Sequence, residues 1–383
     1  MTNEAPTSEK FRVVVAGGGV AALETVLALH DLAGDRVAVT VLAPDEEFVY
    51  RPMTVREPFA YSRADRFELA PIVQDAGATL HRGKLAWVEP KDKVVVTEDD
   101  ERLEYDALVV ALGAKIYPRY KHAVTIDDRR MDEALHGLIQ DIEGGYLKSV
   151  AFVAPGRMAW PLPLYELALM AAGRAYDSNL PLEVTIVTPE TGPLAVFGQT
   201  VSDGVSALLS AKGIRTITDA YAEIPEQGSI VINPGDRRLH AQRVVALPEL
   251  YGPSVRGLPV SEHGFLRVDR FCRVADVEGV YAAGDSVDFP VKQGGVGSQQ
   301  ADAVAESIAA LAGAEIEPQP FDPDINGVLL TDEKPRYIHA KITGGHGFAS
   351  EFSETPIGEA TEKITTRYLT HRLQQLDATE VRT

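Results

Sequence analysis

Three consecutive glycines, Gly17, Gly18 and Gly19, are the residues of this chain best suited to bind a phosphate group. They follow a run of β-branched residues and precede a segment rich in alanine and leucine, a pattern that predicts a strand, a tight turn and a helix. Glycine lets the turn bend sharply and lets a pyrophosphate approach the backbone. The free N–H groups and the positive dipole end of the helix would then hold the phosphates.

The residues after this turn complete a dinucleotide fingerprint, Gly17-x-Gly19-x-x-Ala22. The small side chain of Ala22 lets the helix pack closely on the strand. The helix is expected to begin near Val20 and to end before Gly34. Glycine-rich turns also occur in folds that bind nothing, but here a second apolar strand follows the helix. We therefore interpret the turn as a nucleotide-binding site.

The loop after the second strand offers further candidate contacts. A dinucleotide fold normally carries an acid here for the ribose hydroxyls, but Ala43 occupies that place. Asp45 or Glu46 could reach the ribose instead, and a solvated acidic turn is the alternative. Arg51 is a candidate to pair with a phosphate and Pro52 to lie against a flat ring, with an ordinary structured loop as the alternative.

A second strong signal lies at 281–285, where an apolar strand ends in small residues followed by Asp285. Small residues let a ligand lie against the backbone, and the carboxylate can accept hydrogen bonds from a sugar-alcohol chain. A helix is expected from Gly295 to Ala312, and its N-terminus favours negative charge. Lys292, just before it, adds a full positive charge.

Between these signals the sequence predicts the rest of the first sheet and a small insertion. Short strand-like segments at 85–88, 94–96 and 103–105 are separated by charged turns, which indicates an antiparallel hairpin or a three-stranded meander. A buried strand then ends on Gly113. It is interpreted as the return strand of the parallel sheet.

A second strand–helix–strand unit is expected at 149–187, but its turn, 154–163, has one glycine and three prolines. Proline cannot donate a backbone hydrogen bond, and bulky side chains keep a phosphate away from the chain. This disfavours a conventional NAD(P)H site, although Glu190 could still bind a ribose hydroxyl. Trp160 and Tyr165 are interpreted as packing residues rather than platforms for ring stacking.

The composition of the 383-residue chain, 45% hydrophobic and 24% charged, is typical of a globular protein. Its formal net charge of -19 repels nucleic acid, which is therefore not expected as a partner. The first ten residues lack the apolar core of a secretory leader and no apolar run reaches ~18 residues, so we expect no integral membrane segment and a cytoplasmic location. The nine histidines show no metal-ligand spacing, and no metal site is expected.

The order of the three signals resembles the pyridine nucleotide–disulfide oxidoreductase superfamily, flavoproteins with two dinucleotide-binding domains. The first turn, the strand ending at Gly113 and the 281–285 motif carry the resemblance. It implies an α/β fold with two Rossmann-like, three-layer domains and a small C-terminal interface domain. The implied boundaries are 1–117 with 258–320 for a discontinuous FAD-binding domain, 118–257 for an NAD(P)-binding-like domain with a degenerate phosphate loop, and 321–383 for the interface domain.

Two further motifs, Tyr50-Arg51-Pro52 and Lys292-Gln293-Gly294-Gly295, resemble the branch of sulfide:quinone oxidoreductases and type II NADH dehydrogenases. This resemblance implies that Lys292 and the helix dipole stabilise an anionic reduced flavin, and that Gln299 or Gln300 lies near a quinone pocket. The implied catalytic residues are Lys292 and Gln299. The implied cofactor contacts are Gly17, Gly18, Gly19, Val20, Ala22, Asp45, Arg51, Pro52, Leu85, Ala111, Gly113, Gly284, Asp285, Gly295 and Val296.

The chain also departs from that branch. Sulfide oxidation there uses cysteines beside the flavin, but Cys272 is the only cysteine, which excludes a redox disulfide and argues against sulfide:quinone activity. The glycine-rich second site of type II NADH dehydrogenases is replaced by the proline-containing turn. A helical pattern at 359–376 favours core packing or a dimer contact over membrane insertion.

The sequence therefore predicts an FAD-dependent oxidoreductase without a redox disulfide. Electrons would pass from NAD(P)H or another donor through the flavin to a quinone-like or protein acceptor. The alternative is a flavoprotein whose non-functional NAD domain serves as a partner-binding or redox-sensing module. Expected partners are a small-molecule donor and acceptor, with a homodimer contact or a protein redox partner as further candidates. The stretch 344–347 is expected to be a flexible loop.

Overall fold

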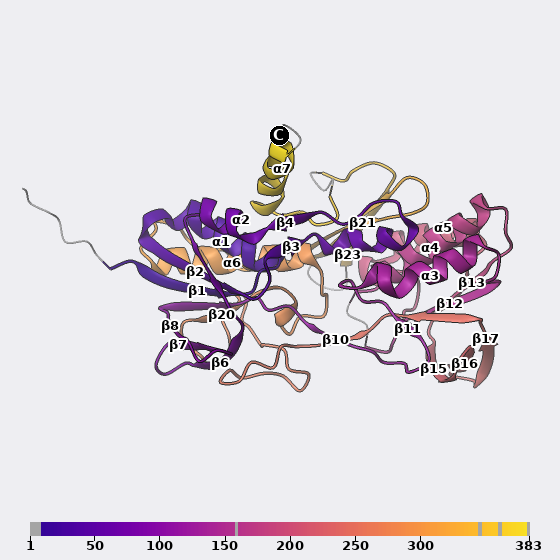
Figure 1. The fold of residues 1–383 in the computed structure, drawn as a ribbon, viewed down its shortest axis with the longest axis horizontal. Helices are drawn as coiled ribbons and strands as arrows, with labels where there is room; N and C mark the ends of the chain where they lie inside the picture. Colours follow the sequence, from indigo (N-terminus) through magenta and orange to yellow (C-terminus); the bar gives the residue numbers. More distant parts are fainter. Residues whose placement is uncertain (1–8, 158–159, 344–346, 359–361, 381–383) are drawn as a thin grey trace, which may run out of the picture.

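The computed structural model describes residues 9–157, 160–343, 347–358 and 362–380. Two parallel sheets lie side by side along the long axis of the molecule, each with helices on one face and a small antiparallel sheet on the other (Figure 1). This arrangement confirms the predicted α/β class with two Rossmann-like units. The predicted loop at 344–347 falls outside the described residues, apart from Gly347, which begins β23.

The first sheet has the strand order β20-β9-β1-β2-β5, and all its pairs are parallel. Its central strand β1 is covered on both faces, which explains its continuous apolar run. Helices α1 and α6 pack together on one face, and the β6-β7-β8 meander lies on the other. The elements of the sheet are β1 Phe11–Ala16, α1 Val20–Ala33, β2 Val37–Ala43, β5 Thr79–Arg82, β9 Ala107–Val110, β20 Val280–Ala282 and α6 Gly294–Leu311.

Short elements connect these strands, and the predicted three-stranded meander is among them. The meander pairs β6 with β7 and β7 with β8, both antiparallel. An antiparallel pair, β10 with β19, joins the two Rossmann-like units. These elements are β3 Glu47–Val49, η2 Arg51–Phe59, β4 Arg66–Glu68, α2 Leu69–Asp75, β6 Leu85–Glu89, β7 Val94–Thr97, β8 Arg102–Glu104, β10 Lys115–Tyr117 and β19 Glu249–Tyr251.

The second sheet has the order β11-β18-β12-β13-β14, again all parallel. Helices α3, α4 and α5 cover one face, and the antiparallel β15-β16-β17 sheet covers the other (Figure 1). The elements are β11 Val124–Thr125, α3 Met131–Glu143, β12 Ser149–Val153, α4 Leu162–Asp177, β13 Glu183–Val187, α5 Gln199–Ala211, β14 Arg215–Ile217, β15 Tyr221–Glu226, β16 Ser229–Asn233, β17 Arg237–His240 and β18 Arg243–Ala246.

The C-terminal segment adds a three-stranded antiparallel sheet and a last helix. The helix expected at 359–376 is wrong at its start, because α7 begins only at Leu369. The buried carboxylate of Glu24, on α1, accepts the backbone N–H groups of Arg367, Tyr368 and Leu369 at 2.7 to 2.9 Å. These bonds hold the chain before α7 against α1 and satisfy N–H groups at the start of the helix. The elements are β21 Asp324–Leu329, β22 Arg336–Thr343, β23 Gly347–Ser353 and α7 Leu369–Glu380.

A buried ion pair ties the C-terminal segment to the second unit. The Nζ of Lys363 lies 2.7 Å from the carboxylate of Glu166, on α4, and both side chains are buried. Lys363 also donates to the carbonyl of Pro52, and the N–H of Leu330 donates to Glu166. Breaking a buried pair of this kind leaves an uncompensated charge, so the pair fixes how three distant segments meet.

Candidate functional site

The first glycine turn lies at the carboxyl ends of β1 and β9, the edge of an open parallel sheet where ligands bind. Gly17 has φ +132°, and a Cβ placed on it would lie 2.2 Å from the carbonyl oxygen of Ala111. The N–H of Ala111 in turn donates to Ala16. Only glycine allows β1 to turn this close to the neighbouring strand.

The next two glycines have different surroundings. A Cβ on Gly18 would contact Leu69 at 3.0 Å, whereas a Cβ on Gly19 would meet nothing within 4 Å. Gly19 has an extended backbone and forms the N-cap of α1, which begins at Val20 as predicted. Ala22 is fully buried where α1 packs on the sheet. The free N–H groups at the start of α1 therefore face open space.

The 284–285 turn approaches this site from β20. Gly284 has φ +71°, and a Cβ on Gly297, in α6, would lie 2.9 Å from its Cα. The hydroxyl of Ser286 donates to the carbonyl of Gly113 at 3.3 Å, which joins the ends of β9 and β20. Asp285 is half-buried beside them, and desolvation raises the pKa of its carboxyl above the usual range.

Lys292 is the buried cation of this site, only 7% exposed. Its Nζ donates to the carbonyl of Val287 and lies 3.9 Å from the ring centroid of Phe265. Burial lowers the pKa of Lys292 to about 8, while the charges of Asp285 and Asp288 act in the opposite direction. The ammonium group is therefore largely protonated at neutral pH but loses its charge in mildly alkaline solution.

The start of α6 is held by glutamine side chains. Gln293 is its N-cap, and its side-chain oxygen accepts the N–H of Val296 at 2.9 Å, directly beside Gly295. Gln300 accepts the N–H of Gly284. Both polar atoms of Gln299, however, bond to the backbone of Asp324 at 2.8 and 2.9 Å. The amide of Gln299 thus holds β21 against α6, and its contact with an acceptor stays a prediction.

Arg51, Pro52, Asp45 and Leu85 lie around the same edge of the first sheet. The guanidinium of Arg51 lies 3.7 Å from the carboxylate of Asp128, a residue that the sequence did not single out. Desolvation raises the pKa of the Asp128 carboxyl, and the charge of Arg51 acts in the opposite direction. Asp45 is exposed just beyond β2, and Leu85 is half-buried at the start of β6.

Around the corresponding turn of the second unit, described at 154–157 and 160–163, polar side chains are bonded within the protein. Arg157 donates to the carbonyl of Leu250 at 2.7 Å and stacks on Tyr251, 4.6 Å from the ring centroid. The hydroxyl of Tyr165 donates to Glu190 at 2.5 Å.

Trp160 packs on Phe197 with ring centroids 5.6 Å apart, and Tyr165 is fully buried, which confirms the packing interpretation of both residues. The other carboxylate oxygen of Glu190 is buried without a partner among the described residues. Glu190 is therefore turned inward, and desolvation raises its pKa.

The remaining candidate reactive groups are absent or inert. Cys272 is fully buried, and burial raises the pKa of its thiol to about 12. In the described parts of the chain, no group of three or more His, Cys, Asp or Glu residues could hold a metal ion. Nor does any helix there have the length and apolar character needed to cross a membrane.

Comparison with known proteins identifies the fold family. Residues 11–307 match the pyridine nucleotide-disulphide oxidoreductase family. The chain belongs to this family. The oxidoreductase superfamily predicted from the sequence is thereby confirmed.

Individual relatives are distant. The sulfide-quinone reductase of Aquifex aeolicus is 23% identical over 257 residues, 63% of this chain and 59% of that protein. The chain spans less than two thirds of the length of the curated relatives it matches, 24% and 59%. The structure of the sulfide:quinone oxidoreductase from Aquifex aeolicus has a TM-score of 0.81 at 19% identity, covering 90% of this chain and 87% of that one. A ferredoxin reductase from Rhodopseudomonas palustris has a TM-score of 0.67, also at 19% identity, covering 87% and 83%.

Proposed function

We propose that this oxidoreductase binds FAD at the first glycine turn and passes an electron pair from a donor other than a conventionally bound nicotinamide to a quinone-like or protein acceptor. Bound flavin would supply the electron-accepting chemistry. The observation that carries the proposal is the open space beside Gly19, bordered by the start of α1 and by the Gly284-Asp285 turn.

The residues of the site fit the parts of FAD. The N–H groups at the start of α1 would bind the pyrophosphate, and Asp285 would accept hydrogen bonds from the ribityl chain. Gly295 and Val296 lie in the first turn of α6, whose N-terminus, together with Lys292, favours negative charge on the ligand. Leu85, Ala111 and the exposed Asp45 are assigned to the rim of the same site.

The internal bonds around the second turn support a donor other than conventionally bound NAD(P)H. Arg157 and Tyr165 use their polar groups for internal bonds, and Glu190 faces inward. The single buried cysteine supports chemistry without a redox disulfide. The names of the relatives include a quinone-reducing enzyme and a ferredoxin reductase, so a quinone and a small redox protein are both candidate acceptors.

The first experiment is a visible spectrum of the purified protein, followed by anaerobic addition of NADH, NADPH or a hydroquinone. Bound flavin that NADH and NADPH leave oxidised but a hydroquinone reduces would support the proposal. Rapid bleaching by NADH would show that the second turn binds nicotinamide after all. Flavin inert to every small donor would favour the alternative of a partner-binding or redox-sensing flavoprotein.

A matched pair of variants tests where the pyrophosphate binds. Gly19→Asp should fold, because the backbone is extended and the Cβ meets nothing within 4 Å, but it adds bulk and negative charge at the phosphate position. We expect flavin content to fall at least about tenfold, a loss of ~1.4 kcal/mol or more in affinity. Gly137→Asp, on α3, also meets nothing within 4 Å and should keep full flavin content. Equal flavin in both variants would overturn the assignment.

A further inference from the structure

A cationic cavity lies at the outer edge of the second unit, on elements that do not form the flavin site. It has a volume of about 360 Å³ and is lined by Arg215, Ile217, Ile232, Arg237, Arg238 and Leu239. No lining residue is acidic, in a chain with 56 acidic and 37 basic residues. The cavity is therefore locally positive on a protein whose overall charge is negative.

The topology explains why arginines meet here. Strand β14 is the edge of the parallel sheet, and Arg215 and Ile217 point to the same face because they are two residues apart. On the antiparallel sheet that covers this face, Arg237 pairs directly with Ile232. Ile217 and Ile232 belong to the same buried cluster between the two sheets. Arg215, on the parallel sheet, and Arg237, on the antiparallel sheet, thus lie beside the same apolar residues, which form the floor of the cavity.

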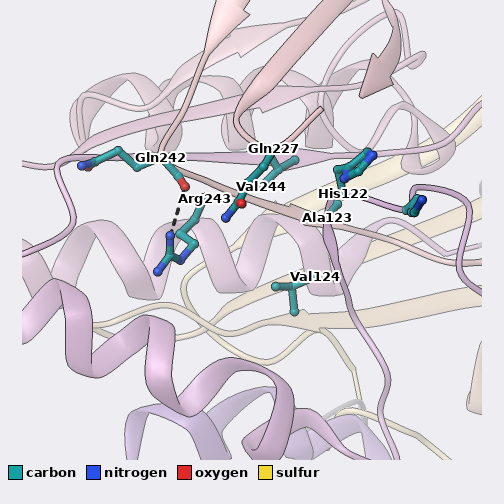
Figure 2. Close-up of a pocket in the computed structure, with 8 residues that line it drawn as sticks. His122, Ala123, Val124, Gln227, Gln242, Arg243 and Val244 are labelled. Carbon is teal, nitrogen blue, oxygen red and sulfur yellow. Dashed lines mark hydrogen bonds between the residues drawn. The ribbon is translucent and has the colours of Figure 1, made fainter. Parts of the chain in front are cut away.

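These arginines have no internal partner. Arg215, Arg237 and Arg238 form no ion pair or hydrogen bond with any other side chain that the structure describes, and all three are exposed. Arg243 lines a different cavity, of about 270 Å³, at the opposite edge of the same sheet (Figure 2), and there it lies 3.4 Å from Asp141. Of the two cavities, the one lined by Arg215 and Arg237 therefore has guanidinium groups available for an external anion.

We propose that the cavity between β14 and β17 binds a small phosphate ester. Guanidinium groups match phosphate oxygens in bidentate geometry, and the two on the face of the apolar residues, Arg215 and Arg237, balance a dianion. The apolar floor formed by Ile217, Ile232 and Leu239 would contact the organic part of the ligand. A volume of this size falls in the ~300–1,000 Å³ range of small-molecule sites. The site is separate from the proposed flavin chemistry and does not depend on it.

The test is calorimetric titration of the flavin-saturated full chain with AMP and, separately, with inorganic phosphate. We expect AMP to bind and inorganic phosphate to bind more weakly, because phosphate lacks a group for the apolar floor. Arg215→Gln with Arg237→Gln should weaken AMP binding at least about tenfold, since each charged hydrogen bond contributes ~1.5–3 kcal/mol. Arg243→Gln removes the same charge at the other cavity and should change affinity less than about twofold.

Three results would overturn the proposal: no AMP binding up to about 10 mM, equal affinity for AMP and inorganic phosphate, or unchanged AMP affinity in the double variant. The thermal midpoint of each variant shows whether it folds, and Arg238→Gln gives a second, milder substitution at the same cavity. Because the titration needs no electron transfer, a failure of the flavin assignment leaves its outcome readable.

Discussion

The two Rossmann-like units begin with the same strand–turn–helix topology but differ in the residues that surround the turn. In the first unit, Gly17 passes against Ala111 and Gly19 borders open space at the start of α1. In the second, Arg157 is bonded to Leu250 and Tyr165 to Glu190. A shared topology therefore places a helix N-terminus above each sheet, but only the side chains decide whether a phosphate can reach it.

The difference also concerns charge. The first site has the buried cation Lys292 next to the half-buried Asp285. The second has Glu190, whose carboxylate receives a hydrogen bond from within the protein. A ribose acceptor must point toward its ligand, whereas the carboxylate of Glu190 is bonded to Tyr165.

Replacing the first glycine of each turn by alanine should separate the two turns most strongly. Gly17→Ala forces a side chain into φ +132° and 2.2 Å from a carbonyl oxygen, so we expect a loss of about 3 kcal/mol or more in stability. The thermal midpoint should fall by about 5 °C or more. Differential scanning calorimetry measures the change.

Gly156→Ala is the matched control in the second turn. Its Cβ would meet only the exposed ring of Tyr221, at 3.1 Å, and its φ is not in the left-handed region. We expect its midpoint to stay within about 2 °C of the wild type. Similar losses in both variants would mean that the two turns carry the same backbone constraint, and the comparison would fail.

Removing the cation of the first site should change the flavin's midpoint potential. Lys292→Met deletes a charge that favours the anionic reduced cofactor, an interaction of ~1–2 kcal/mol, so the potential should fall by about 20–40 mV. Because the pKa of Lys292 is about 8, the difference from the wild type should shrink as the pH rises above that value. Spectroelectrochemical titration at several pH values measures it.

Lys121→Met, at an exposed residue that lines the cavity of about 270 Å³, is the control for loss of one surface charge. It should leave the potential unchanged, because exposed charges far from the flavin are screened. If both variants shifted the potential equally, or if the Lys292→Met difference were independent of pH, the lysine would not act on the flavin through its charge.

Local sequence patterns predicted most of the elements around the first glycine turn because strand, turn and helix signals there are contiguous. The run up to Gly17, the helix start at Val20 and the β20 end at 281–285 all follow from periodicity and glycine placement. That the proline-containing second turn is a poor phosphate site stays a prediction.

The buried charges could not be predicted, because their partners lie far apart in the chain. Glu24 binds the start of α7 more than 340 residues away, and Glu166 pairs with Lys363 across 197 residues. From their polarity alone, such residues are predicted to be exposed. The helix start predicted at 359 is wrong for the same reason. The helical pattern in the sequence includes residues whose N–H groups donate to Glu24, a partner that the local sequence does not show.

The smallest effect should come from Glu190, and it tests the second turn alone. Desolvation raises its pKa in the folded state, so the wild type is most stable below the unfolded pKa of about 4.3 and loses that stability as the pH rises through the raised value. Glu190→Gln cannot ionise and can still accept the bond from Tyr165. Its thermal midpoint relative to the wild type should therefore be higher at pH 8 than at pH 4.5, by an amount equivalent to about 1 kcal/mol.

The same variant decides whether the second turn has kept a nucleotide. With the carboxylate turned inward, Glu190→Gln should leave the response of the flavin to NADH as it is in the wild type, and the pH-dependent midpoint should be the sole change. A wild type that NADH reduces, with a Glu190→Gln variant that it no longer reduces, would instead show that the carboxylate turns outward to hold a ribose. The two turns would then differ in sequence but not in function.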